Sequence, residues 1–177
     1  MAALLRKAFQ KYPYVSNCLT YGTLYVGAEF LQQTLTRKIL AEGDAQPYDK
    51  GSLVRYAIVG NTIYPTMLYT WYKWLDKRFV GTAARTVVKK LVLDQLIFTP
   101  PVIIAFYISM SILERKDDIF EECKTKLLPT FKTSCLFWPP AQLLNFLLVP
   151  PAARVVFVGG CALVWVNILC WFKRQDY

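Results

Sequence analysis

The chain has 177 residues, a length that fits one compact domain and leaves little room for a second. Hydrophobic residues make up 55% of it and charged residues 19%, below the roughly 25% that is usual in soluble proteins. It contains no histidine, which excludes Ser-His-Asp and Cys-His catalytic sites and histidine-based zinc sites. Glycine-rich nucleotide-binding loops are absent from the sequence as well. We therefore expect no enzyme and no cofactor or metal.

The charged residues leave five long windows without a single Lys, Arg, Asp or Glu. An α-helix rises about 1.5 Å per residue, so about 20 residues match a hydrocarbon core of roughly 30 Å. A soluble helix of this length would carry charge at regular intervals on its wet face. The sequence therefore predicts an all-α, polytopic transmembrane bundle of four or five spans, embedded as one domain over residues 1–177. The windows are Tyr12–Ala28, Tyr56–Tyr72, Gln95–Leu113, Thr133–Ala153 and Val155–Phe172.

The start of the chain is basic. The first eleven residues hold Arg6, Lys7 and Lys11 and no acid, which is typical of either a mitochondrial leader or a basic amphipathic anchor. Both interpretations stay open, because the segment runs directly into the first window. That window and the second contain many Ser, Thr, Asn and Tyr residues. Such polar content favours helices that pack together or line a wet cavity over a lone helix in lipid.

The connectors between the windows are polar. Ala41–Ser52 predicts a solvent loop, and Phe79–Arg85, with its Gly81, predicts a break between helices. Glu114–Lys126 carries charges of alternating sign, which predicts an exposed connector or helix with a solvated face. Basic residues flank every window, as anionic lipid headgroups select, and no basic platform for nucleic acid stands out. They divide almost evenly between the two sides, so the orientation stays open.

The last two windows are separated only by Val149–Arg154, which predicts a tight turn and a C-terminal helical hairpin. Five cysteines form no CxxC pair, so we expect neither a disulfide framework nor a zinc site, and one redox-responsive pair stays open. Prolines inside the windows each remove a backbone hydrogen bond and predict kinked helices. These prolines are Pro65, Pro100, Pro101, Pro139 and Pro140.

Two acids adjoin the apolar windows: Glu29, followed by Gln32, and Asp94, followed by Gln95. An ionisable group at membrane depth is costly and tends to face a bundle interior or a wet cavity. Two interpretations stay open for these residues. They line a path for polar solutes, or they pair with basic residues at the interface and lock the bundle. The candidate basic partners are Arg55 for the first acid and Lys89 or Lys90 for the second.

A third polar group lies in the fourth window. Trp138, Gln142 and Asn145 are spaced i, i+4 and i+7, which places them on one face of a helix. Two amides on one face in hydrocarbon require hydrogen-bond partners. Those partners are either side chains across the bundle or the water of an aqueous lumen.

Sequence motifs run in the same order along nearly the whole chain. The strongest is W-P-x-x-Q-x-x-N-F-x-x-V-P, from Trp138 to Pro150, and the next is L-D-Q-x-x-F-x-P, from Leu93 to Pro100. Lys11-Tyr12-Pro13, Trp71-Tyr72 and Trp165 support them. With these motifs the chain resembles the family of small mitochondrial inner-membrane and peroxisomal membrane proteins named after Mpv-seventeen and the twenty-two-kilodalton peroxisomal membrane protein.

The chain departs from the pattern of that family in its first half. Glu29 stands where the first helix usually has Asp, and Tyr64-Pro65 replaces the usual Gly-Pro before Trp71-Tyr72. A histidine often seen near these positions is absent. These departures leave the resemblance intact, and they leave open what the first two helices do.

The resemblance implies a four-span organellar membrane protein that passes small solutes and supports metabolite and redox homeostasis and mitochondrial DNA. The basic, acid-free start favours the mitochondrial inner membrane over the peroxisomal membrane. We expect a weakly selective channel, in contact with membrane lipids and small polar solutes and not directly with nucleic acid. A homo-oligomer stays open. The alternative is a non-conducting scaffold or assembly factor that uses the exposed Glu114–Lys126 connector. Our candidate pore-lining or bundle-locking residues are Glu29, Gln32, Arg55, Asp94, Gln95, Trp138, Gln142 and Asn145.

Overall fold

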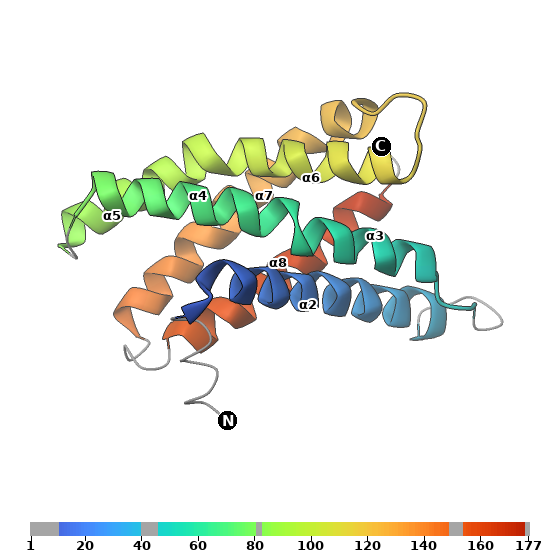
Figure 1. The fold of residues 1–177 in the computed structure, drawn as a ribbon, viewed down its shortest axis with the longest axis horizontal. Helices are drawn as coiled ribbons and strands as arrows, with labels where there is room; N and C mark the ends of the chain where they lie inside the picture. The colour runs from blue at the N-terminus through green and yellow to red at the C-terminus, as the bar shows by residue number, and fades with distance from the viewer. Residues whose placement is uncertain (1–10, 40–45, 81–82, 149–153, 176–177) are drawn as a thin grey trace.

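The computed structural model is helical in every regular element that it describes (Figure 1), and the expected all-α class is confirmed. It describes residues 11–39, 46–80, 83–148 and 154–175, without the side chains of residues 13, 76, 145–147, 154–156 and 159. Most of the predicted turn Val149–Arg154 therefore lies outside the described residues. The helices are α2 (Pro13–Thr34), the π-helical turn η1 (Leu35–Ile39), α3 (Lys50–Asn61), α4 (Ile63–Arg78), α5 (Ala84–Leu93), the π-helical turn η2 (Asp94–Phe98), α6 (Thr99–Leu113), α7 (Glu121–Leu147) and α8 (Arg154–Arg174).

The observed helix boundaries test two of the predicted connectors. The Asp49 side chain accepts a hydrogen bond of 2.9 Å from the backbone N–H of Ser52 and so starts α3. The predicted loop Ala41–Ser52 is therefore wrong over its last residues, which are the first turn of a helix. The break predicted at Phe79–Arg85 is confirmed, because α4 ends at Arg78 and α5 begins at Ala84.

Several prolines lie near helix starts. Pro65 lies in the first turn of α4, and Pro100 and Pro101 lie in the first turn of α6. A proline is tolerated at the start of α4 because its missing N–H would have no intrahelical partner. Pro100 and Pro101 follow η2 without a break in the helix, so each removes a backbone hydrogen bond there. Just before α6, the N–H of Thr99 bonds to the carbonyl of Asp94, which makes η2 a wider turn than an α-helix. α7 contains Pro129, Pro139 and Pro140 in its interior, and the kinks expected from them stay a prediction.

α5, η2 and α6 form one continuous helix of 30 residues, Ala84–Leu113, which contains the third uncharged window. Among the described residues it is the one helix that is long and apolar enough to cross a membrane. A single helix of this kind occurs both as a membrane span and in the core of soluble proteins. The expected four or five spans therefore stay a prediction.

The helices form a ring that follows the order of the chain (Figure 1). α2 packs along α3 and α4, these pack against α6, α6 packs against α7, and α7 packs against α8. α8 then returns to α2 and closes the ring. The contact between α7 and α8 is the one expected of a C-terminal hairpin. α5 makes its main contact with its own continuation η2, so the ring is less tightly packed around α5.

An aromatic core fills the part of the ring near α3. The rings of Tyr25, Tyr56 and Phe106 lie 6.1 to 6.4 Å apart between centroids, and all three residues are at most 2% exposed. The hydroxyls of Tyr107 on α6 and Thr130 on α7 share a hydrogen bond of 2.7 Å. Ring pairs at such distances attract one another, so they join α2, α3 and α6, and the hydrogen bond between Tyr107 and Thr130 adds α7.

A glycine allows the closest helix approach in this core. A Cβ atom at Gly60 on α3 would lie 2.7 Å from Cβ of Tyr25 and 3.0 Å from the carbonyl oxygen of Tyr21, both on α2. Neither atom is the flexible end of a side chain, so a side chain at this position could be accommodated only if the backbone of α2 or α3 shifted. Small residues at such contacts let helix backbones approach each other closely.

We expect Gly60→Ala to lower the free energy of unfolding by about 1–3 kcal/mol, because the added methyl overpacks the contact between α2 and α3. The matched control is Gly27→Ala on α2, where the new methyl meets nothing within 4 Å. There the better helix propensity of alanine leaves stability unchanged or raises it by up to about 1 kcal/mol. Unfolding of both purified variants in detergent measures the difference, and equal behaviour would contradict the close approach.

A charge cluster ties helix ends together where α6 ends and α7 begins. Glu122 accepts hydrogen bonds of 2.7 and 2.9 Å from Lys173 on α8, and its side chain lies 2.9 Å from Lys116 and 3.4 Å from Lys126. Lys173 also reaches Glu114, at 2.7 Å. Glu122 and Lys126 are only 7% and 5% exposed. The solvated face predicted for Glu114–Lys126 is therefore wrong for these residues, because the end of α8 packs over them.

The charge cluster makes stability depend on pH. Burial alone would raise the pKa of Glu122, but hydrogen bonds from Lys173 and Lys116 outweigh it and lower the pKa from an ordinary 4.5 to about 2. A carboxyl group with a lowered pKa contributes stability that is fully present above its unfolded-state pKa. That contribution is therefore present above pH 4.5 and is lost as the pH falls toward 2.

We expect Glu122→Gln to cost about 3 kcal/mol of stability at pH 7, because it leaves buried lysines without their partner. The adjacent, exposed Glu121→Gln should stay within about 0.5 kcal/mol of the wild type. Unfolding measured between pH 7 and pH 3 should show the gap between wild type and Glu122→Gln narrowing below pH 4.5. A gap that does not change with pH would contradict the lowered pKa.

Candidate functional site

A cavity of about 1090 Å³ lies inside the ring, between α4, α5 and α6 on one side and α7 and α8 on the other. This is slightly larger than most small-molecule sites, which measure roughly 300–1,000 Å³. Core residues such as Phe106 and Leu169 form its floor. Valine and leucine side chains form much of its wall, including Val87, Val88, Leu91, Val92 and Leu143. Among the described side chains, four polar ones other than tyrosine line it, namely Asp94, Gln95, Thr99 and Gln142.

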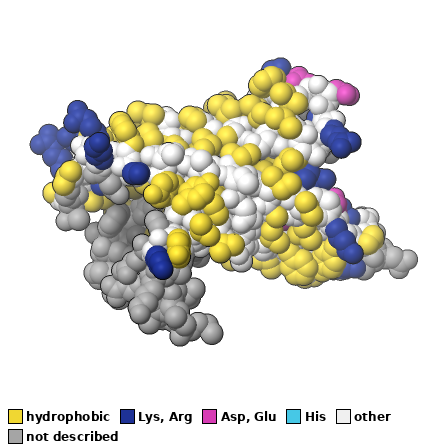
Figure 2. All heavy atoms as spheres, viewed as in Figure 1, with side chains coloured by type: hydrophobic (Ala, Val, Ile, Leu, Met, Phe, Trp, Pro, Cys, Tyr) yellow, Lys and Arg dark blue, Asp and Glu magenta, His cyan; other side chains and the backbone are white. Residues whose placement is uncertain are grey.

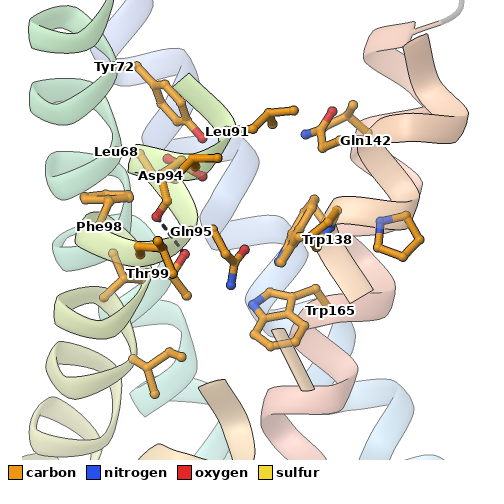
Figure 3. Close-up of a pocket in the computed structure, with 18 of the residues that line it drawn as sticks. Leu68, Tyr72, Leu91, Asp94, Gln95, Phe98, Thr99, Trp138, Gln142 and Trp165 are labelled. Carbon is orange, nitrogen blue, oxygen red and sulfur yellow. Dashed lines mark hydrogen bonds between the residues drawn. The ribbon is translucent and has the colours of Figure 1, made fainter. Parts of the chain in front are cut away.

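Asp94 is positioned by the wide turn η2. Its carboxylate accepts a 2.9 Å hydrogen bond from the indole N–H of Trp71 on α4, and the hydroxyl of Tyr72, also on α4, lies close to it. Figure 3 shows the Tyr72 hydroxyl directed toward Asp94. The Thr99 hydroxyl donates to the backbone carbonyl of Asp94 at 3.0 Å, which satisfies a group in the widened turn. The carboxylate is therefore held in place by neutral donors.

Gln95 connects the same turn to α7. Its side-chain amide donates to the Ser134 hydroxyl at 2.9 Å and lies 3.4 Å from the sulfur of Cys135. Trp138 follows Ser134 by one helical turn, and Gln142 follows Trp138 by another, so these residues share a face of α7. In Figure 3 Gln142 lies across the cavity from Leu91.

Four of the residues predicted from the sequence line this one cavity: Asp94, Gln95, Trp138 and Gln142. They come from two segments that are more than forty residues apart in the chain. The side chain of Asn145 lies outside the described residues. Whether any of these residues lines a conducting pore stays a prediction.

The other three predicted residues lie at the opposite part of the ring, and Glu29 is fully buried there. Its carboxylate accepts hydrogen bonds from Arg174 at 2.6 Å, Ser52 at 2.7 Å and Gln33 at 2.8 Å. Gln32 donates to the backbone carbonyl of Asn167 on α8 at 3.2 Å. These contacts join α2 to α3 and α8, so their geometry matches the bundle-locking interpretation.

The expected ion pairs were wrong in their partners. Arg55 pairs with Asp49 at 3.6 Å and Glu114 at 3.8 Å rather than with Glu29. Asp94 bonds to aromatic donors rather than to the lysines that precede it on α5. The reason is tertiary: α8 returns to α2 and brings Arg174 to Glu29, and α4 packs beside η2 and brings Trp71 to Asp94.

Sequence reasoning missed several residues that line the cavity or hold Asp94. Trp71 and Tyr72 matched a motif, but no pattern indicated that they bond to Asp94. Tyr21, Tyr64 and Trp165 also line the cavity. The only signal for Trp71 and Trp165 was the family motif. No local signal distinguished Tyr21 and Tyr64 from ordinary packing residues.

Comparisons with known proteins agree with the motifs. The model of the Mpv17 / PMP22 family matches residues 111–170. The chain is 33% identical to the Mpv17-like protein of Bos taurus, over 97% of this chain and 83% of that protein. The chain belongs to the Mpv17 / PMP22 family. It is also 30% identical to the Mpv17-like protein of Xenopus laevis, over 94% of this chain and 80% of that one. Protein sym1 of Aspergillus oryzae is 30% identical, over 94% of each chain.

No solved structure matches the chain. The segment matched by the model of the Mpv17 / PMP22 family contains Trp138, Gln142 and Trp165, one wall of the cavity. Asp94 and Gln95, on the other wall, precede that segment, although the similarity to whole relatives extends over nearly the entire chain. Membership of the family is consistent with an organellar membrane protein.

Proposed function

We propose that this chain is a multi-pass protein of an organellar membrane and acts as a weakly selective channel for small solutes. The observation that carries the proposal is the cavity. It is large, it lies between helices of one ring, and its apolar walls hold a few polar groups placed by η2 and α7. Polar and ionisable side chains inside a membrane bundle usually mark the path of a solute or ion.

The surface supports a position in the membrane. Figure 2 shows hydrophobic side chains across the middle of the molecule and lysine and arginine side chains at its two ends. Leu19, Leu96 and Leu136, on three different helices, are 60 to 76% exposed. Large apolar side chains exposed on many elements are costly in water and are satisfied by lipid. In such a position the lysine and arginine side chains at the two ends of the molecule lie at the two headgroup regions of the membrane.

The passage is closed in this arrangement. The aromatic core forms the floor of the cavity, and beyond it the charge cluster and the Glu29–Arg174 pair join the ends of α2, α3, α6, α7 and α8. Conduction therefore requires these helices to separate. We propose that the core around Tyr25 and Phe106 is the barrier of a closed channel.

We further propose the mitochondrial inner membrane as the location, with the peroxisomal membrane as the alternative. The support is the run of Arg6, Lys7 and Lys11 before the first acid, Glu29. In that membrane a solute channel would serve metabolite and redox homeostasis and the maintenance of mitochondrial DNA.

Single-channel recording in planar bilayers tests the channel. We expect discrete openings from the purified wild type, and a weaker preference for cations over anions in the double variant Asp94→Asn, Gln142→Leu, because charged groups along a pore set its selectivity. The matched control makes the same chemical changes at exposed positions, as Asp118→Asn, Gln46→Leu. Openings that are identical in all three proteins would contradict a pore lined by Asp94 and Gln142.

A folded and inserted wild type that never opens would favour the second candidate, a non-conducting scaffold or assembly factor. The surface available for a partner is then the exposed part of the Glu114–Lys126 connector. It excludes Glu122 and Lys126, which the fold itself uses, and retains Arg115, Asp117, Asp118, Glu121 and Lys124. Loss of a co-purifying partner on changing these exposed residues, with the fold intact, is the signature of that function.

The location has its own test. We expect a fusion with a fluorescent protein at the C-terminus to localise to mitochondria, and substitution of Arg6, Lys7 and Lys11 by glutamine to reduce that localisation, since import favours basic, acid-free starts. Substitution of Lys77, Arg78 and Arg85 by glutamine removes the same charge elsewhere and serves as the control. A peroxisomal pattern in the wild type would select the alternative membrane.

A further inference from the structure

Asp94 differs from the other acids that hold the bundle together. Glu29 has Arg174, Glu122 has Lys173, and each of these pairs is closer than 3 Å. The carboxylate of Asp94 is half-buried, and its stabilising neighbours among the described residues are neutral, the indole of Trp71 and the hydroxyl of Tyr72. None of the ion pairs formed by the described residues reaches it. A carboxylate in apolar surroundings is costly without a positive partner.

Aromatic rings surround the space that this carboxylate faces. The rings of Tyr21 and Tyr64 lie 5.2 Å apart between centroids, and both residues line the cavity beside Tyr72. On the opposite wall the rings of Trp138 and Trp165 lie 6.2 Å apart. The faces of such rings are electron-rich and attract cations, above all alkylated ammonium groups, which lose little hydration energy when they bind.

We propose that the cavity binds an organic cation, a molecule with an alkylated or protonated amine and an apolar body. The positive group lies against Asp94 and the aromatic rings, and the apolar body lies against the valine and leucine wall that includes Val88, Val92 and Leu143. The volume of about 1090 Å³ accommodates a molecule of that kind.

The chemistry of the site favours an organic cation over a metal ion. Hard metal ions take six or more oxygen ligands, and here one carboxylate stands among aromatic rings. Among the described residues no group of three or more His, Cys, Asp or Glu side chains is placed to hold a metal. The inference concerns the cavity of the proposed channel, but binding requires no passage through the membrane, so it goes beyond that function.

The experiment compares two ions of the same shape and opposite charge, tetraphenylphosphonium and tetraphenylborate. Equilibrium dialysis measures their binding to the purified full chain in nonionic detergent, with detergent alone as the blank. We expect saturable binding of the phosphonium ion and no saturable binding of the borate. Asp94→Asn keeps the size of the side chain and removes its charge, and should weaken phosphonium binding about tenfold or more. The matched control is the exposed Asp118→Asn, which should bind like the wild type.

A second variant keeps the test decisive if Asp94→Asn does not fold. Trp138→Leu retains an apolar wall and removes one aromatic face, and should weaken phosphonium binding about threefold or more. Equal binding of the two ions by the wild type, or wild-type phosphonium binding by a folded Asp94→Asn variant, would overturn the proposal. Phosphonium binding by a protein that never opens in bilayers would leave this inference standing and remove the channel. Channel openings from a protein that does not bind the phosphonium ion would support the channel and overturn this inference.

Discussion

Two neighbouring basic residues at the end of α8 reach carboxylates on two sides of the helix ring. Lys173 bonds to Glu122 on α7, and Arg174 bonds to Glu29 on α2. α8 follows α7 in the chain, whereas α2 is far from α8 in the sequence. The bond between Arg174 and Glu29 therefore closes the ring. Buried ion pairs contribute little net stability but penalise arrangements that leave a charge unpaired. The aromatic core supplies much of the energy of packing, and these pairs determine which helix ends meet.

The two parts of the ring differ in how their acids are paired and in how closely their helices pack. Where α3, α6, α7 and α8 meet, acids have cationic partners, and the space between helices is filled by the rings of the core. Around α5 the helices separate, a cavity remains, and the acid that lines it has neutral donors only. The described part of the ring therefore has one end where acids and bases are paired and another end with a cavity and a carboxylate that no described ion pair neutralises.

The local backbone gives Asp94 and Gln95 their places. Two consecutive prolines cannot donate backbone hydrogen bonds, and the turn that precedes them widens into η2. Single π-helical turns are rare and occur frequently at functional sites. In this chain the turn carries both the carboxylate that faces the cavity and the amide that bonds to Ser134 on α7. The π-helical turn η2 therefore supplies both the carboxylate of the cavity and a contact between its two walls.

Local sequence patterns were enough to predict the helical class, the break between α4 and α5, the family, and the four polar residues Asp94, Gln95, Trp138 and Gln142 that meet at the cavity. These depend on charge-free windows, proline and glycine positions and motifs, all of which are local. The packing of the helices was needed to show that Glu29 pairs with Arg174, that Glu122 and Lys126 are buried, and that Trp71 bonds to Asp94. Those facts depend on the return of α8 to α2 and on the packing of α4 beside η2, and contacts between residues so far apart in the chain leave no periodic signal in the sequence.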